Sequence, residues 1–226
     1  MASGVAVLPL GKRGLTRRGR TRRLRAMARP SLKTRMRLLA AARATFCHRG
    51  YEGASVAEIA ARARVTKPAL YYHFGSKAGL YEALVVENLD ERWRRMRAAA
   101  ESQGSLEDRL TRVIEACFRH ARENREGTRI CFAALFAAPG EVPRRLSFMR
   151  RGRRNFDLVL KLMREGKRHG ELRRDLDAYD LAAAIYSRVI ANALAQAVSG
   201  SSARLTKARA AVRLFLQGAL RDGSGR

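Results

Sequence analysis

The stretch SVAEIAARARVTKPALYYHFGSK, residues 55–77, decides the fold of this chain. Its first part is a short helix that Ser55 caps, and Glu58 stands three residues on, where its carboxylate can reach back to the cap's own amide. Ile59, Ala60 and Ala63 form the inner face of this helix. A turn of about three residues, near 62–64, separates it from the next helix.

The second part of the stretch is another short helix, capped by the Thr66 hydroxyl. Pro68 is tolerated in its first turn, because that turn has no amide partner to lose. Leu70 and Phe74 lie four residues apart and point inward. A helix that buries one stripe presents its remaining side chains outward, where a short helix can enter a DNA major groove about 12 Å wide. The pattern predicts a helix-turn-helix whose outward residues are Lys67, Pro68, Tyr71, Tyr72 and His73.

Helical patterns continue on both sides of this unit. Apolar residues recur at helical spacing from Thr34 to Gly50, and Ser76 caps a fourth helix that reaches about Ala100. Four or five further helices are predicted, near 106–122, 128–137, 142–169, 178–198 and 204–221. Strand-like alternation is missing from the sequence, so the expected fold is all-α with about nine helices.

The segment SVAEIAARARVTKPALYYHFGSKAGLYEAL resembles the N-terminal domain of tetracycline-repressor-type (TetR family) transcriptional regulators, and VTKPALYYHFGSK is its specific part. The resemblance is close over 34–85. It implies a helix-turn-helix domain at 34–77 and a helical ligand-binding and dimerisation domain at 78–226. A second, weaker likeness lies in GELRRDLDAYDLA, residues 170–182, which is similar to the turn that enters the family's dimer helices.

The same resemblance implies roles for individual residues. Lys67 and Tyr71 would meet base edges, and Tyr72, His73 and Lys77 would meet phosphates. Ser55 and Thr66, at helix N-termini, would aim cap hydroxyls and amides at the DNA backbone. Two alternatives stay open: one tyrosine of the pair packs in the core, and His73 forms a structural hydrogen bond.

The sequence departs from the family pattern at two places. Arg64 stands in the turn where the family usually has glycine, so a residue with a side chain has to adopt a left-handed conformation, at a cost of roughly 1 kcal/mol. Ala78 and Gly79 stand where the family favours an acid, which weakens the cap of the fourth helix. Both departures affect how rigidly the helix after Thr66 is held.

The charge of the chain favours a polyanionic partner. Lys and Arg number 47 against 20 acids, a formal net charge of +27. Residues 1–33 contain ten basic residues and no acid, and without an apolar period they are expected to form a disordered basic arm. Arg29 and Lys33 of this arm offer a further route to DNA, and a solvated extension is the alternative.

The predicted second domain contains four phenylalanines and a methionine that the resemblance places around a small-molecule effector: Phe118, Phe132, Phe136, Phe156 and Met163. Burial in an ordinary core is the alternative for each. The arginine-rich run at 149–154 is typical of a solvated helix face, or else attracts an anionic ligand.

The last two predicted helices suggest a homodimer. Leu205, Val212 and Phe215 lie on a two-heptad seam, and Tyr186 and Ile190 lie on the second apolar side of the preceding helix. Two reading helices would recognise the two halves of a palindromic operator in double-stranded DNA. The alternative is that both sides belong to the core of a monomer.

Other classes of protein fit the sequence less well. The four histidines lie far apart and common catalytic motifs are missing, so no enzyme, metal or cofactor is expected. An RNA-binding or nucleoid-type protein is the alternative that the overall charge permits. Three cysteines without a CxxC pair suit buried thiols in a reducing cytoplasm. No apolar run approaches the roughly 18 residues of a membrane span.

Overall fold

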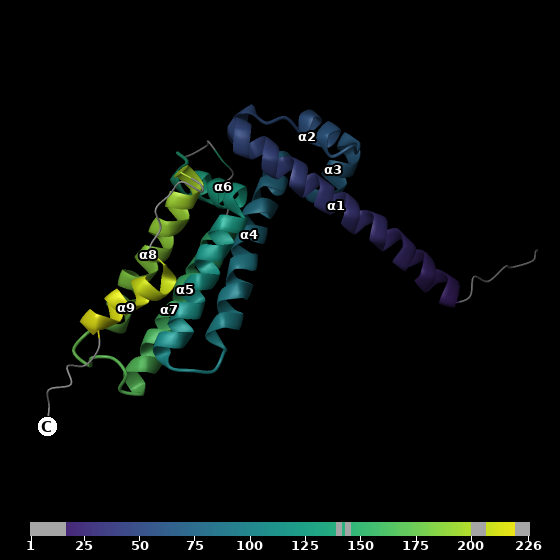
Figure 1. Cartoon of the computed structure of the whole chain (residues 1–226). Coiled ribbons are helices and arrows are strands. Elements are labelled where there is room, and N and C mark those ends of the chain that lie inside the picture. The colour runs from purple at the N-terminus through teal and green to yellow at the C-terminus, as the bar shows by residue number, and fades with distance from the viewer. Residues whose placement is uncertain (1–16, 139–141, 143–145, 200–206, 220–226) are drawn as a thin grey trace, which may run out of the picture.

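The computed structural model describes residues 17–138, 142, 146–199 and 207–219, and in this part of the chain the regular structure is helical throughout, as predicted. The helices are α1 (Arg17–Gly53), α2 (Val56–Arg62), α3 (Lys67–Phe74), α4 (Lys77–Ala100), α5 (Leu106–Glu123), α6 (Arg125–Phe136), α7 (Leu146–Arg168), α8 (Ala178–Ser199) and α9 (Ala208–Ala219). Figure 1 shows α4, α5, α7, α8 and α9 running side by side, with α6 across the end of this bundle that faces α1.

Helix α1 begins at Arg17, so the expected disorder of residues 17–33 and the helix start at Thr34 are wrong. Arg, Leu, Met and Ala dominate this segment, and all are good helix formers without an apolar period. The helix passes Pro30, whose ring removes one backbone donor. Its N-terminal part projects away from the rest of the molecule (Figure 1). The remainder of the predicted arm, 1–16, lies outside the described residues.

The predicted caps and stops of the first four helices are confirmed. Gly50 interrupts α1 with a φ of 70° and a ψ of −178°, a conformation that side chains disfavour. The hydroxyls of Ser55, Thr66 and Ser76 accept hydrogen bonds from the amides three residues on, at 3.0, 3.4 and 2.9 Å. The Glu58 carboxylate forms an ion pair with Arg49 at 3.0 Å, where the sequence predicted a bond back to the cap.

Two hydrophobic cores hold the helices together. The N-terminal core joins α1, α2, α3 and the first half of α4, and it also takes Ile130 and Ala134 from α6. The C-terminal core joins the second half of α4 to α5, α7, α8 and α9. Helix α4 therefore belongs to both cores, and the packing does not divide at residue 77.

Helix α8 is apolar over most of its length, although Asp180 and Arg188 interrupt its apolar residues. Its 22 residues reach a mean hydropathy of 1.3 over 18 residues, so by length and composition it could cross a membrane. In the fold, 44% of that window is buried against neighbouring helices, among them α5, α6 and α7. The Asp177 carboxylate caps α8 by accepting from the amides of Tyr179 and Asp180, and these bonds hold its pKa below the usual value.

Candidate functional site

Helix α3 presents a bare polar and aromatic face. Leu70 is fully buried in the N-terminal core and anchors the helix, while Phe74 packs against that core from its edge. On the opposite side Tyr71 is 48% exposed and Tyr72 is 83% exposed, and Lys67 is exposed as well. Because both tyrosines stand out from the protein, the alternative that one packs in the core is wrong.

The residues around this face differ in how many contacts their side chains make with the rest of the protein. His73 is half-buried and its ring meets the Tyr72 ring edge-on at 5.3 Å. The Lys77 ammonium donates to the Glu52 carbonyl at 3.2 Å and lies 4.4 Å from the centre of the Tyr51 ring. Lys77 thus ties the start of α4 to the end of α1, whereas Lys67 has no such contact among the described residues.

The turn between α2 and α3 is held by Arg64. Its φ of 53° confirms the predicted left-handed conformation. The Arg37 guanidinium of α1 donates to the Arg64 carbonyl at 2.9 Å, so α1 fixes the turn from below. Beside this turn lies an open groove of about 640 Å³. Its charged lining residues are Lys33, Arg37, Arg62 and Arg64, and none of its lining residues is acidic. Its charge suits a phosphate backbone.

The junction of α3 and α4 depends on Gly79. A Cβ atom at this position would lie 2.1 Å from the Phe74 carbonyl oxygen. An acidic side chain of the kind expected here from the family pattern would therefore not fit. The missing side chain lets α4 start directly against the end of α3.

A cavity of about 560 Å³ opens between α4, α6, α7 and α8. Its walls are mostly apolar, with polar side chains from Asn88, Thr128 and Tyr186 and guanidinium groups from Arg92, Arg150 and Arg153. The remaining lining residues are Val85, Leu89, Cys131, Phe132, Leu135, Met149, Gly152 and Ile190.

The cavity corrects the predicted pocket residues. Phe132 alone of the five lines it. Met163 is fully buried in the C-terminal core, Phe156 packs edge-on against Tyr186, and Phe136 is 72% exposed. Phe118 lines a different hollow, beside α9. Sequence reasoning did not identify Asn88 and Arg92 as cavity residues. The two polar residues lie four apart on the otherwise apolar inner side of α4, and this spacing could have indicated a polar site there.

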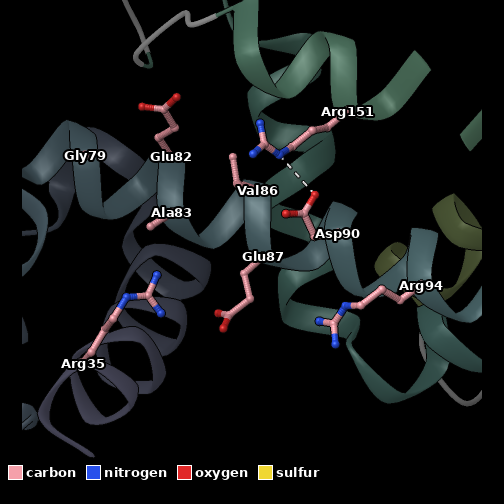
Figure 2. A pocket seen from close by; sticks show the side chains of 9 residues that line it. All are labelled: Arg35, Gly79, Glu82, Ala83, Val86, Glu87, Asp90, Arg94 and Arg151. Carbon is pink, nitrogen blue, oxygen red and sulfur yellow. Dashed lines mark hydrogen bonds and ion pairs between the residues drawn. The ribbon is translucent and has the colours of Figure 1, made fainter. Parts of the chain in front are cut away.

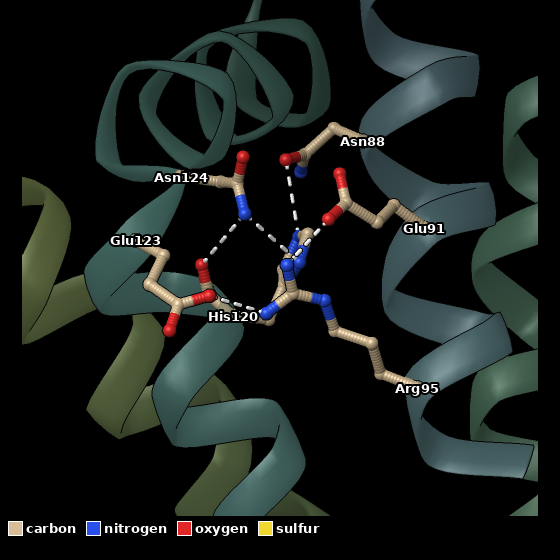
Figure 3. A network of polar contacts seen from close by, with 6 residues as sticks. All are labelled: Asn88, Glu91, Arg95, His120, Glu123 and Asn124. Atoms are coloured by element: carbon tan, nitrogen blue, oxygen red, sulfur yellow. Dashed lines mark hydrogen bonds and ion pairs between the residues drawn. The ribbon is translucent and has the colours of Figure 1, made fainter. Parts of the chain in front are cut away.

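Figure 3 shows the polar network behind the cavity wall. The buried His120 ring lies between Asn88 Oδ1 at 3.1 Å and Asn124 Nδ2 at 3.2 Å, so α4, α5 and the start of α6 meet at one imidazole. Burial first, and then the charge of Arg92, lower the pKa of His120 to about 4. Next to it, Arg95 joins Glu91 and Glu123, each at 2.5 Å.

A second hollow, of about 590 Å³, lies between α1, α4 and α7 and differs in its charges. Figure 2 shows Arg151 pointing to Asp90, at 3.1 Å, and carboxylates alternating with guanidinium groups around the rim. Arg154 contacts the same Asp90 carboxylate. The acidic and basic side chains that line this hollow are equal in number, so their formal charges cancel.

The predicted dimer residues fall into three groups. Val212 is fully buried in the C-terminal core, so it is not available to a second chain, and Phe215 packs against that core. Tyr186 and Ile190 line the cavity. Leu205 lies outside the described residues. Among the described residues, the large hydrophobic side chains that remain exposed on α8 and α9 are Tyr179, Ile190, Leu194, Val198 and Leu214.

The cysteines show no disulfide among the described residues. Cys117 is buried, and burial raises the pKa of its thiol to about 11. Cys131 accepts a hydrogen bond from Asn88 Nδ2 at 3.3 Å, and burial raises its pKa too. These thiols stay protonated at neutral pH.

Comparison with known proteins gives one consistent result. The family model described as bacterial regulatory proteins of the tetR family matches residues 38–84. The transcriptional activator FasR of Mycolicibacterium smegmatis is 37% identical over 113 residues, 50% of this chain and 52% of FasR. The A-factor receptor protein of Streptomyces griseus is 33% identical over 109 residues, 47% of this chain and 37% of the receptor. The chain thus spans about half, or less, of the length of these relatives.

The likeness to solved structures is longer but shows the fold alone. The TetR family regulator PfmR of Thermus thermophilus superposes with a TM-score of 0.64 over 84% of this chain and 99% of that one, at 24% identity. The ketosteroid regulator KstR2 of Mycobacterium tuberculosis gives a TM-score of 0.64 at 22% identity, over 83% and 95%. Residues 38–84 thus match the model of the tetR family of bacterial regulatory proteins, and 84% of the chain has the fold of a solved TetR family regulator.

Proposed function

We propose that this chain is a sequence-specific DNA-binding transcriptional regulator that binds a palindromic operator as a homodimer and is released by a small-molecule effector. The observation that carries the proposal is the free face of α3, where Leu70 anchors one side and Lys67, Tyr71 and Tyr72 stand out on the other. Lys67 can donate to the acceptors on a guanine edge, and the tyrosines can contact bases or phosphates.

The charge distribution around α3 supports the same function. The groove beside the α2–α3 turn, lined by Lys33, Arg37, Arg62 and Arg64, would lie along a phosphate backbone while α3 occupies the major groove. Ser55 and Thr66 cap the two helices, and in this proposal the N-terminal amides of both helices would face phosphates. Lys77 acts in this proposal by fixing the start of α4, since its ammonium is already engaged.

Dimerisation is supported by the exposed apolar side chains on α8 and α9. Ile190, Leu194 and Val198 recur at helical spacing along α8, and Leu214 is 66% exposed on α9. A stripe of this kind on a helix is covered when two copies of the chain pack together. A twofold dimer would bring one α3 to each half of a palindrome.

The effector would occupy the cavity between α4, α6, α7 and α8, whose volume lies within the roughly 300–1,000 Å³ of small-molecule sites. Its wall includes α6, and α6 also packs into the N-terminal core through Ile130. Occupation of the cavity can thus alter the placement of the helix-turn-helix domain formed by α1–α3, which we call the reading domain. We expect repression as the direction of regulation and the cytoplasm as its place, although the relative FasR is named as an activator.

The test is selection of bound duplexes from a random pool, followed by measured affinities for the winning sequence. A palindromic consensus is expected, held about a thousandfold or more tighter than random duplex. Lys67→Ala should lose about 1–3 kcal/mol of discrimination at one position in each half-site. Lys161→Ala, at an exposed lysine on α7, is the matched control and should bind as the parent does.

Two results would contradict the proposal. Equal affinity for all duplexes would favour the nucleoid-type alternative, and a consensus without twofold symmetry would contradict the dimer. Transcription from a template that carries the consensus then decides the direction of regulation, and stimulation there would overturn repression.

A further inference from the structure

The cavity between α4, α6, α7 and α8 carries an unbalanced positive charge. Among its lining residues the charged ones are Arg92, Arg150 and Arg153, and none is a carboxylate. Arg153 is paired with Asp157 at 3.2 Å. Arg92 and Arg150 have no carboxylate partner among the described residues.

The acids nearest to this part of α4 are engaged elsewhere. Asp90 binds Arg151 on the side of the neighbouring hollow (Figure 2), and it also binds Arg154. Glu91 binds Arg95 in the network of Figure 3. Arg92 comes directly after these two acids in the sequence, but its guanidinium turns to the cavity and finds neither of them.

The hydrogen bonds of Arg92 are incomplete. Its Nη2 donates to the Tyr186 hydroxyl at 3.3 Å, whereas its Nε is buried and has no acceptor in the described part of the chain. A buried donor without an acceptor is unfavourable, and more so when it is charged. The Tyr186 oxygen accepts from Arg92, so the hydroxyl proton remains free to donate.

Other titratable groups at the cavity supply no negative charge at neutral pH. Burial raises the pKa of Cys131, which stays a thiol, and burial likewise raises the pKa of Tyr186, which stays a phenol. The neighbouring His120 has its pKa lowered to about 4 and is neutral. An anion is therefore the charge that this site lacks.

We infer that the effector is an amphiphile with an apolar tail and a single carboxylate, which Arg92 and Tyr186 bind. The planar guanidinium matches a carboxylate in shape as well as charge. The tail would lie against apolar walls such as Leu89, Phe132 and Ile190. Arg150, exposed beside Met149 on α7, would attract the anion at the mouth. This inference rests on the proposed effector site.

The first experiment compares four ligands that share a twelve-carbon tail: dodecanoate, dodecanol, dodecyl phosphate and dodecyltrimethylammonium. Each is titrated into the full chain below its micelle concentration, with binding followed by calorimetry. Dodecanoate is expected to bind at least tenfold tighter than each of the others. Equal or tighter binding of dodecanol or of the cation would overturn the anionic site, and tighter binding of the phosphate would overturn the carboxylate. Failure of all four to bind would overturn the inference as a whole.

The second experiment assigns the anion to Arg92. Arg92→Gln should remove the tenfold preference for dodecanoate over dodecanol, and Tyr186→Phe, which keeps the ring in place, should weaken dodecanoate binding several-fold. Arg151→Gln is the matched control, because Arg151 faces the other hollow and should leave the preference intact (Figure 2). A preference that survives Arg92→Gln and Tyr186→Phe would overturn the assignment.

Operator affinity in the absence of ligand is measured for the same variants. It reports on the folded reading domain and is expected to match the parent. If operator binding is normal but no carboxylate preference exists, the ligand inference fails while the DNA-binding function stands. If no variant and no parent chain prefers any operator, the proposed function fails instead.

Discussion

The two hydrophobic cores of this protein differ in how they are closed. The C-terminal core is sealed by long helices that cover one another, and it contains fully buried side chains such as Leu110, Ile114 and Met163. The N-terminal core is smaller and remains open on one side until α6, from the other half of the chain, covers it with Ile130 and Ala134. The N-terminal core therefore depends on a helix that lies outside the helix-turn-helix segment.

The place where the cores meet explains the position of the cavity. Along α4, Leu84, Val85 and Leu89 belong to the N-terminal core, and Met96 belongs to the C-terminal one. Asn88 and Arg92 lie at the changeover, line the cavity and contact the His120 and Tyr186 side chains. Polar side chains are tolerated at this position along α4 because neither hydrophobic core covers it.

The largest expected effect comes from a substitution that tests whether the N-terminal core depends on α6. Ile130→Ala should lower the free energy of unfolding by about 2–5 kcal/mol, the usual cost of truncating a buried isoleucine, because Ile130 is 3% exposed in the N-terminal core. Hydrogen exchange should quicken in α1–α3 although the change lies in α6. Leu135→Ala, at a position 58% exposed on the same helix, is the control and should cost little. Faster exchange confined to α5–α9 would contradict the shared core.

The next effect concerns the imidazole at the junction. The pKa of His120 falls from 6.5 to about 4 on folding, so the unfolded chain takes up a proton at a higher pH than the folded one does. Its share of stability is complete above pH 6.5 and is lost as the pH falls toward 4, by about 3 kcal/mol at roughly 1.36 kcal/mol per unit.

Denaturant unfolding at several pH values measures this loss. His120→Asn should flatten the slope of stability between pH 6.5 and 4, and His169→Gln, which alters an exposed histidine, should not. An unchanged slope in the His120 variant would show that other groups set the acid sensitivity.

A smaller effect compares one helix cap in each region. Thr66 caps α3 and Ser105 caps α5, and each accepts from the amide three residues on. Alanine at either site should cost about 1 kcal/mol of stability. Operator affinity should fall for Thr66→Ala alone, since only α3 reads DNA in our proposal. Equal loss of affinity in both variants would mean that stability, and not the placement of α3, limits binding.

The smallest effect is at the turn between α2 and α3. Arg64→Gly relieves the left-handed backbone at φ 53° and should raise the free energy of unfolding by up to about 1 kcal/mol. Arg64→Ala retains the strained conformation and should leave stability nearly unchanged. Thermal melting of the two variants side by side measures the difference, and a glycine variant no more stable than the alanine one would show that the turn is unstrained.

Sequence reasoning predicted local structure well, because caps, stops and apolar spacing act within a few residues. The caps at Ser55, Thr66 and Ser76 and the left-handed Arg64 are all present. It also predicted correctly that α3 exposes Tyr71 and Tyr72 opposite Leu70. The start of α1 was missed, since a helix rich in Arg and Ala has no apolar period to reveal it.

The cavity could not be predicted in the same way, because which apolar residues line a space depends on how helices pack. Periodicity identifies Met163, Phe156 and Phe132 alike as inward-facing, yet Phe132 alone of them borders the space. Periodicity also identified Val212 as part of an apolar stripe, but this residue packs in the C-terminal core of its own chain and not against a second chain. Apolar spacing distinguishes a covered side from a bare one, but not the partner that covers it.

The absence of a side chain at Gly79 has a consequence for the engineering of this protein. A methyl group added there would collide with the Phe74 carbonyl, so α3 and α4 would have to separate. Any such separation would rotate the recognition surface without altering a single residue on it. Variants at this position would change the orientation of α3 relative to α4 and leave the exposed side chains of α3 unchanged.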